Sequence, residues 1–248
     1  MIDSDLNYLK KQRIIWEHKP VLQRLYNEQF YSRLLTHCAA GKQILEIGSG
    51  SGFLRSFAPS VWRTDILVAP WLHATIDAHH LPFADGALDN VIGLDVLHHF
   101  NKPMSVLQEI QRVLRVRGRL VLVEPWITPF SRFVYNRIHQ EICDFNAAPW
   151  EEDQDQFGDQ KKAFDGNPAI PYLLLEQGSD TLKRELPAMG LCAFERFSLF
   201  SYLLTFGFRT ITLLPEVAYP IVYSFERTTQ PLWENVAALR ALIVWEKR

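Results

Sequence analysis

Residues 44–52 read Ile-Leu-Glu-Ile-Gly-Ser-Gly-Ser-Gly, so a short apolar run with one acidic side chain, Glu46, leads directly into three glycines at alternate positions. Glycines at 48, 50 and 52 permit positive φ angles and, because they lack Cβ, let a ligand pack against the main chain. A helix that begins after such a loop points free N–H groups into the same space. The stretch therefore predicts a cofactor-binding loop between a strand and a helix, as in α/β folds.

The residue after the third glycine separates two kinds of cofactor loop. A dinucleotide-binding loop reads G-x-G-x-x-G/A, and its third small residue allows close packing beside a bound pyrophosphate. This chain has Phe53 at that position and the spacing G-x-G-x-G. The Glu46 carboxylate disfavours a pyrophosphate and suits a ligand that carries an ammonium or another cation. These features argue against a nicotinamide dehydrogenase.

Further acidic residues follow at informative intervals. Asp65 ends a short apolar run 17 positions after Gly48, close to the interval of about 20 residues at which α/β nucleotide folds place a ribose-binding carboxylate. We therefore predict Asp65 as the ribose ligand, with Ile66 beside it. Asp77-Ala78 precedes Leu81-Pro82-Phe83, and Asp95 precedes the paired histidines His98 and His99.

Over residues 40–126 the chain resembles the class I S-adenosylmethionine-dependent methyltransferases, in particular the quinone-biosynthesis C-methyltransferases. The shared motifs occur in the same order: the acidic strand with its glycine loop, Asp77-Ala78 before Leu-Pro-Phe, the Val96-Leu97-His98-His99 stretch, and the turn around 113–118. The resemblance implies S-adenosylmethionine as the cofactor and places Asp77 at the exocyclic amine of adenine. It implies the following cofactor-binding residues: Glu46, Gly48, Ser49, Gly50, Gly52, Asp65, Ile66, Asp77, Ala78 and Asp95. Arg117 departs from the family, because it stands where the turn usually has proline.

Apolar runs at 43–47, 61–65, 91–94 and 119–124 alternate with helical or loop segments, which predicts a doubly wound, Rossmann-like, mostly parallel sheet. The glycine loop should open a helix of two turns, 51–58, and Pro103 should begin a helix over 103–115. Runs near 192–199 and 238–247 predict late strands, which by resemblance form a terminal antiparallel hairpin. We expect one domain, 1–248: a helical cap over the sheet edge and cofactor mouth (1–40), the cofactor core (41–125), a lid insertion (126–190), and the terminal strands with an apolar insertion (191–248).

Three histidines are candidates for a catalytic base, since histidine titrates near neutral pH. His98 and His99 should follow a strand at the cofactor face, where they either remove a proton from the acceptor or only hydrogen-bond the next helix start. His139 is on an aromatic insertion, which forms either an acceptor pocket or a surface helix. We predict no metal site, because His139, Glu141 and Cys143 are two residues apart and do not converge from a helix.

Composition restricts the partners. The net charge is −2 without a basic stripe, which argues against nucleic acid. Three scattered cysteines and an N-terminus without an apolar signal region favour a cytoplasmic location. The segment 197–225 has only Arg209 and Glu216 as charged residues, but its uncharged run 197–208 is too short to span a bilayer, and we expect Pro215 and Pro220 to break the structure that follows. It is either core or a homodimer interface, or a lid or membrane-contacting patch.

We therefore expect a methyltransferase that acts on a small apolar or aromatic acceptor by in-line displacement. The alternative is a binding or interaction protein that retains this fold without transfer.

Overall fold

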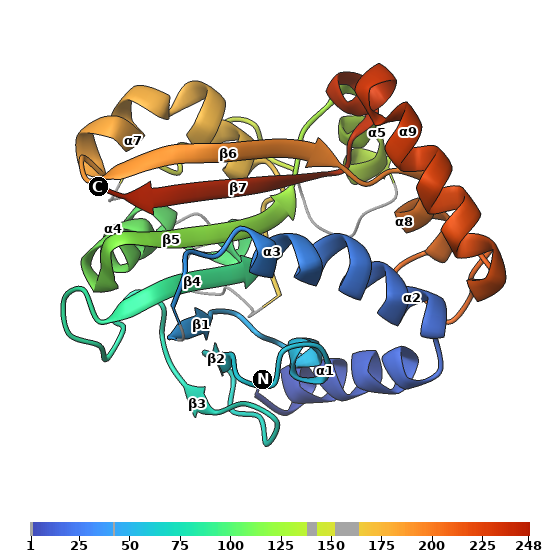
Figure 1. Cartoon of the computed structure of the whole chain (residues 1–248), viewed down its shortest axis with the longest axis horizontal. Helices are drawn as coiled ribbons and strands as arrows, with labels where there is room; N and C mark the ends of the chain where they lie inside the picture. The colour runs from blue at the N-terminus through green and yellow to red at the C-terminus, as the bar shows by residue number, and fades with distance from the viewer. Residues whose placement is uncertain (1, 42, 138–142, 152–163) are drawn as a thin grey trace.

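The computed structural model describes residues 2–41, 43–137, 143–151 and 164–248 (Figure 1). Within these residues seven strands form one sheet in the order β3-β2-β1-β4-β5-β7-β6. The strands from β3 to β5 are parallel, whereas β7 is antiparallel to both of its neighbours. This confirms the predicted mostly parallel sheet with a terminal antiparallel hairpin. The strands are β1 (Ile44–Glu46), β2 (Trp62–Asp65), β3 (Ala74–Thr75), β4 (Leu88–Leu94), β5 (Leu114–Pro125), β6 (Met189–Phe197) and β7 (Arg240–Lys247).

The central strands are apolar on both faces, because helices cover both. Successive side chains of a strand point to opposite faces. In β5, Leu120 and Leu122 join the core on one face, whereas Val121 and Val123 join the core on the other. Strand β7 alternates in the same way, so β5 and β7 together form the middle of two hydrophobic cores.

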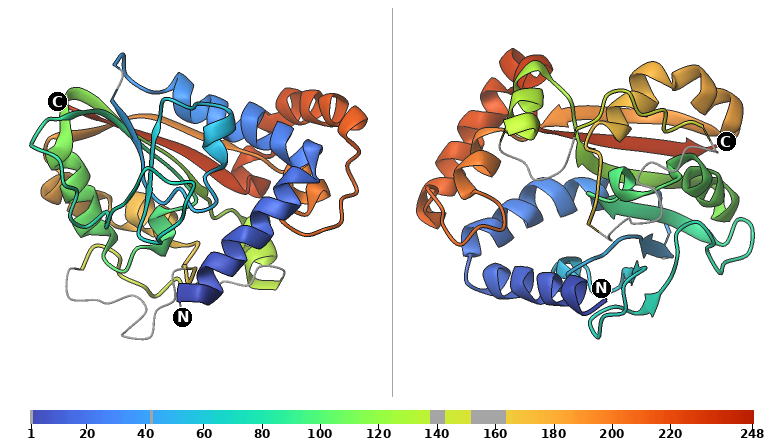
Figure 2. Two further views of the ribbon diagram at one scale, coloured as in Figure 1. Left: turned by 90° about the horizontal axis from the view of Figure 1, so that it is seen from below. Right: turned by 180° about the vertical axis from the view of Figure 1, so that it is seen from behind.

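The helices divide between the two faces (Figures 1 and 2). Helices α4 and α7 pack on one face, and α2 and α3 pack on the other with the turns that follow β6. The α-helices are α1 (Ile2–Glu17), α2 (Pro20–Leu25), α3 (Ser32–Thr36), α4 (Pro103–Val113), α5 (Pro129–Arg137), α6 (Ile170–Tyr172), α7 (Ser179–Glu185), α8 (Phe200–Thr205) and α9 (Tyr219–Ala237). The π-helical segments are η1 (Tyr26–Tyr31) and η4 (Leu173–Gln177), and the 3₁₀ turns are η2 (Phe53–Ser56), η3 (Leu97–His99) and η5 (Glu216–Ala218).

Two sequence predictions were wrong in detail. The helix expected over 51–58 is only the single 3₁₀ turn η2, because Gly52 is still in the left-handed region and the chain must reach β2 within a few residues. Prolines 215 and 220 were expected to interrupt structure after 208, yet α9 runs for 19 residues. Pro220 is in the first turn of α9, where its missing N–H costs no hydrogen bond.

The apolar segment 197–225 is partly core and partly surface. Phe197, Leu214 and Tyr219 are buried against α2 and η1, whereas other members of the segment are exposed. Lys19, at the corner between α1 and α2, is buried, and its Nζ lies 2.5–2.9 Å from four backbone carbonyl oxygens between Thr205 and Ile211, among which its three N–H donors are shared. Within the described residues, we find no helix with the length and apolarity to span a membrane.

Candidate cofactor and acceptor site

Five acidic residues lie at the carboxyl ends of five adjacent parallel strands, which is where open α/β sheets bind ligands. Asp65 and Glu46 are the last residues of β2 and β1, Asp95 directly follows β4, and Glu124 is near the end of β5. Asp77 follows β3 by two residues. We call these five residues the acidic row; along the edge of the sheet their order is Asp77, Asp65, Glu46, Asp95, Glu124.

The glycine loop lies in the middle of the acidic row, between β1 and β2. Gly48, Gly50 and Gly52 all have positive φ, of 60°, 49° and 69°. A Cβ on Gly48 would collide with the side chain of Val96, so Gly48 is needed for packing. A Cβ on Gly50 would have only the Leu9 side chain of α1 nearby, at 3.6 Å. The loop backbone therefore meets α1 rather than the sheet at Gly50.

Glu46 is buried at the end of β1. One carboxylate oxygen, Oε2, accepts a hydrogen bond from Ser49 Oγ at 2.7 Å, which links two of the predicted cofactor residues. Burial raises the pKa of Glu46 to about 7, against the smaller lowering effects of Ser49 and Arg63. The site therefore favours a cation beside Glu46, because a cation would restore the ionised carboxylate.

Asp65 is also buried, and it orders the glycine loop. Its Oδ2 accepts the Gly50 N–H at 2.8 Å, and its Oδ1 accepts the Leu67 N–H at 2.9 Å. Burial raises the pKa of Asp65 above its ordinary value, although these backbone donors oppose that effect. The next side chain, Ile66, is 61% exposed and offers an apolar surface beside the carboxylate.

Asp77 occupies the β3 end of the acidic row. Its Oδ1 accepts both the backbone N–H of His79, at 2.9 Å, and a hydrogen bond from His79 Nδ1, at 2.7 Å. Burial would raise the pKa of Asp77, but the hydrogen bonds and charges of its histidine neighbours outweigh it and lower the pKa. Ala78 packs into the main core, so only its backbone faces outward toward a ligand.

Asp95 is held in a strained conformation, with φ of 54°. Its carboxylate forms an ion pair with Arg240 of β7. The buried Arg240 also donates to the Tyr202 hydroxyl of α8 at 3.0 Å. The Asp95 carboxylate is thus paired within the protein. The role at the cofactor that the sequence predicted for Asp95 therefore falls to its backbone.

The paired histidines after β4 have different surroundings. His98 is buried, and its Nδ1 lies 2.7 Å from Glu124 Oε2. The other Glu124 oxygen, Oε1, accepts the N–H groups of Val96 and Leu97 at 2.9 and 2.8 Å. Burial raises the pKa of Glu124 to about 7, against the opposing backbone donors. His99 is partly exposed, and its Nδ1 is 3.2 Å from the carbonyl oxygen of Asp165.

Sequence reasoning did not identify Glu124. It was read only as the end of a strand, although an acidic residue before the strand-ending Pro125 repeats the pattern of Glu46 and Asp65. Arg240 and Tyr202 were also missed, and their positions in the sequence gave no signal of their proximity to Asp95. His139, together with Glu141, lies outside the described residues.

Helix α1 packs against the glycine loop and the turns beside it. Arg13 donates to the carbonyl oxygen of Ser51 at 2.7 Å, and its guanidinium lies 4.6 Å from the ring centre of Trp71. Trp71 in turn donates to the carbonyl oxygen of Gly50 at 2.8 Å. Trp16 stacks on Phe53, with ring centres 4.2 Å apart. Phe53, which breaks the dinucleotide pattern, therefore anchors α1.

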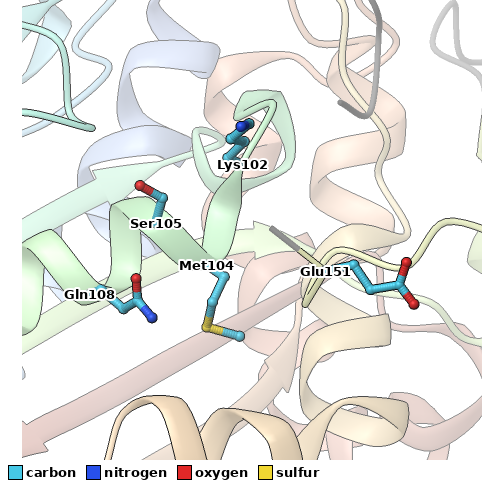
Figure 3. Close-up of a pocket in the computed structure, with 5 residues that line it drawn as sticks. All are labelled: Lys102, Met104, Ser105, Gln108 and Glu151. Carbon is cyan, nitrogen blue, oxygen red and sulfur yellow. The ribbon is translucent and has the colours of Figure 1, made fainter. Parts of the chain in front are cut away.

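A pocket of about 200 Å³ lies elsewhere, beside the first turns of α4 (Figure 3). Its lining shares no residue with the acidic row or the glycine loop, and we do not assign the cofactor to it. The lining residues are Lys102, Met104, Ser105, Gln108 and Glu151.

Comparison with known proteins shows which domain and fold this chain resembles. Residues 45–122 match the family model described as a methyltransferase domain. Over 91% of this chain and 94% of the other, the fold matches a solved S-adenosylmethionine-dependent methyltransferase from Archaeoglobus fulgidus, with a TM-score of 0.53 and 14% identity. Residues 45–122 are thus similar to methyltransferase domains, and the whole fold is similar to that of S-adenosylmethionine-dependent methyltransferases. This likeness implies S-adenosylmethionine as the cofactor.

Two curated relatives show how far the similarity extends. The malonyl-[acyl-carrier protein] O-methyltransferase of Laribacter hongkongensis is 31% identical over 133 residues, which is 43% of this chain and 45% of that protein. The ubiquinone/menaquinone biosynthesis C-methyltransferase UbiE of Bordetella avium is 28% identical over 192 residues, which is 64% of this chain and 67% of that protein. The chain thus spans less than half of the first relative and about two thirds of the second.

Proposed function

We propose that this protein transfers a methyl group from S-adenosylmethionine to a small apolar or aromatic acceptor. The observation that carries the proposal is the acidic row, which extends along one edge of the sheet on both sides of a loop with glycine at every second position. Its members follow the order in which an extended adenosyl cofactor would need them. Asp77 would hold the adenine amine, Asp65 the ribose hydroxyls, and Glu46 the cationic methionine end.

The residues present fit this cofactor. Gly50 keeps the loop open to close approach, Ile66 supplies an exposed apolar face beside the ribose acid, and Glu46 lies where a cation is favoured. When bound, S-adenosylmethionine supplies an electrophilic methyl group, so no protein nucleophile is required. The protein's main contribution is then to hold the acceptor in line, and orientation alone can supply about 7–11 kcal/mol.

The acceptor would bind on the Asp95 side of the glycine loop. Here the buried Arg240 guanidinium lies 4.9 Å from the ring centre of Tyr202 and 5.8 Å from that of Phe30. Tyr26 packs against Phe30, with ring centres 4.8 Å apart. An aromatic surround of this kind supports an apolar or aromatic acceptor. The names of the two relatives refer to malonyl-[acyl-carrier protein] and to ubiquinone/menaquinone biosynthesis.

His98 and Glu124 would supply the base when the acceptor must lose a proton. With Glu124 ionised, Nδ1–H of His98 donates to Oε2, which leaves Nε2 as the proton acceptor. Glu124 thereby fixes both the tautomer and the orientation of the His98 ring. Its other oxygen, Oε1, holds the backbone N–H groups of Val96 and Leu97, the two residues before His98. His99 stays a second candidate, because it lies on the same turn and is more exposed.

Isothermal calorimetry and thermal melting test the proposed cofactor. S-adenosylmethionine and S-adenosylhomocysteine should bind and raise the melting temperature, whereas NAD should do neither. Binding of NAD without binding of S-adenosylmethionine would refute the proposal.

A further inference from the structure

Helix α9 and the turn before it expose a continuous apolar stripe to solvent. The side chains of Val217, Ile221, Phe225, Leu232 and Val236 are 86%, 74%, 58%, 83% and 55% exposed. At 100° of rotation per residue, the four positions on α9 fall within an arc of about 60° on one side of the helix, and Val217 lies in the 3₁₀ turn before it. We call them the α9 stripe. Large exposed patches of apolar side chains often mark sites that bind another protein or a membrane.

The orientation of α9 is fixed, so the stripe cannot turn inward. On the opposite side of the helix Glu226 is buried, and its carboxylate accepts the N–H groups of Leu199 and Ser201 at 2.7 and 2.8 Å. Tyr219 is fully buried in the core beneath α9. Figures 1 and 2 both show α9 at the outer edge of the molecule.

Neighbouring segments extend the apolar surface. Ile211 and Leu213, in the loop before η5, are 59% and 68% exposed. Phe200 of α8 is partly exposed, and its ring centre lies 5.9 Å from that of Phe225. The hydroxyls beside the stripe are satisfied internally, because Thr228 donates to the Ser224 carbonyl and Thr229 donates to the Phe225 carbonyl, both at 2.9 Å. Hydroxyls paired in this way need no water.

The charges around the stripe are mostly positive. On α5, α9 and the loop 206–217, the exposed charged side chains in the described structure are four arginines and one glutamate, Arg132, Arg137, Arg209, Arg227 and Glu216, and Glu234 of α9 is partly exposed. The chain as a whole has a net charge of −2. This local excess of arginine is complementary to an anionic surface and does not favour a second copy of the same positively charged face.

We propose that the α9 stripe docks on an anionic lipid membrane, with α9 parallel to the bilayer plane and its apolar side chains at the boundary between headgroups and acyl chains. Amphipathic helices with arginines beside an apolar face bind membranes in this manner. Helix α8 connects this surface to the candidate site, since Phe200 touches the stripe while Tyr202 binds Arg240. Docking would thus place the acceptor side of the site close to lipid.

Vesicle flotation tests the proposal, with phosphatidylcholine vesicles that either contain or lack phosphatidylglycerol. The wild-type protein should float with the anionic vesicles. The triple variant Ile221→Ser, Phe225→Ser, Leu232→Ser should lose about 100-fold or more in partitioning, because three large apolar side chains no longer enter the boundary. Arg209→Gln with Arg227→Gln should weaken the preference for anionic lipid.

A matched control removes three exposed apolar side chains elsewhere, Trp62→Ser, Val116→Ser and Leu191→Ser, which are 55%, 61% and 50% exposed on β2, β5 and β6. This control should float like the wild type, and unchanged melting temperatures would show that all variants fold.

Wild-type protein that stays in the buffer, or a triple variant that still floats, would overturn the proposal. So would a wild-type dimer that the triple variant converts to monomer, because a second copy would then cover the stripe. Flotation does not depend on cofactor binding, so its outcome is separate from that of the proposed function.

Discussion

At the residue scale, Asp65 combines two tasks, because the carboxylate that orders the Gly50 N–H is also the predicted ribose ligand. Asp65→Ala should weaken S-adenosylmethionine binding by about 1.5–3 kcal/mol, since hydrogen bonds from the ribose hydroxyls to a charged acceptor are lost. Calorimetry measures this directly. Asp180→Ala, whose side chain is 96% exposed on α7, is the control and should bind normally. Unchanged affinity in Asp65→Ala would remove Asp65 from the site.

Glu46 should make both stability and cofactor binding depend on pH. Its folded-state pKa of about 7 lies above the ordinary value of 4.5, so folding favours the protonated form. The stabilisation is complete below the unfolded pKa and is lost as the pH rises through about 7. The cofactor-free wild type should therefore melt progressively below Glu46→Gln as the pH rises from about 5 to 8.

Cofactor affinity should change with the opposite sign. A cationic ligand needs the ionised carboxylate, so the affinity of the wild type should rise with pH through about 7, whereas the affinity of Glu46→Gln should stay flat. Parallel pH profiles in calorimetry would show that Glu46 does not face the cation.

The His98–Glu124 pair gives a kinetic prediction. His98→Gln should lower kcat roughly 10²–10⁴-fold while cofactor affinity is nearly unchanged, because a base acts on the acceptor and not on the cofactor. Glu124→Gln should also lower kcat and should remove the rise in rate near pH 7 that ionisation of Glu124 causes. His18→Gln, at an exposed position, is the control. If His98→Gln keeps full turnover, either orientation of the acceptor is the whole mechanism or His99 is the base.

At the element scale, α1 should control the release of the cofactor. Trp16 of α1 stacks on Phe53 of η2, and Phe53 stacks on Phe208 at 5.4 Å between ring centres. Trp16→Leu keeps an apolar side chain but loses stacking worth about 0.5–1.5 kcal/mol per aromatic pair. The release rate of labelled S-adenosylmethionine should rise by up to about tenfold. Trp62→Leu, which changes an exposed tryptophan of β2, should have no effect. If Trp16→Leu lowers the melting temperature but leaves the release rate unchanged, the aromatic stack stabilises the fold and does not control cofactor release.

The elements differ in how well the sequence predicted them. β1, β4, α4 and the late hairpin were found because each has an apolar pattern, and Pro103 marks the start of α4. β2 was found from the acidic residue that ends it, since its other residues include Arg63 and Thr64. Strand β5 extends back to Leu114, beyond the predicted 119–124, because the turn residues Arg115–Gly118 are incorporated into the strand with Arg117 at a φ of 66°. Helix α9 was missed because proline was read as a helix breaker without regard to its position in the first turn.

At the scale of the whole molecule, one part of the site could be predicted from the order of motifs in the sequence. That part lies at the ends of neighbouring parallel strands. The proximity of Asp77, Asp65, Glu46 and Asp95 follows from the motifs, because each motif ends a parallel strand and these strands are neighbours in the sheet. Arg240 and Tyr202 could not be inferred, because they reach Asp95 only after β7 inserts antiparallel between β5 and β6. The acceptor side of the site therefore depends on long-range contacts that no local motif records.

The most direct test of the central claim is a transfer assay. Purified protein is incubated with methyl-labelled S-adenosylmethionine and an extract of its own cells, and mass spectrometry identifies any molecule that gains the label. We expect label in a small apolar or aromatic compound, strongly reduced with His98→Gln and with Asp65→Ala and unaffected with Asp180→Ala. If the wild type binds S-adenosylmethionine and yet labels nothing beyond a protein-free control, the fold serves binding without transfer and the proposed activity is wrong.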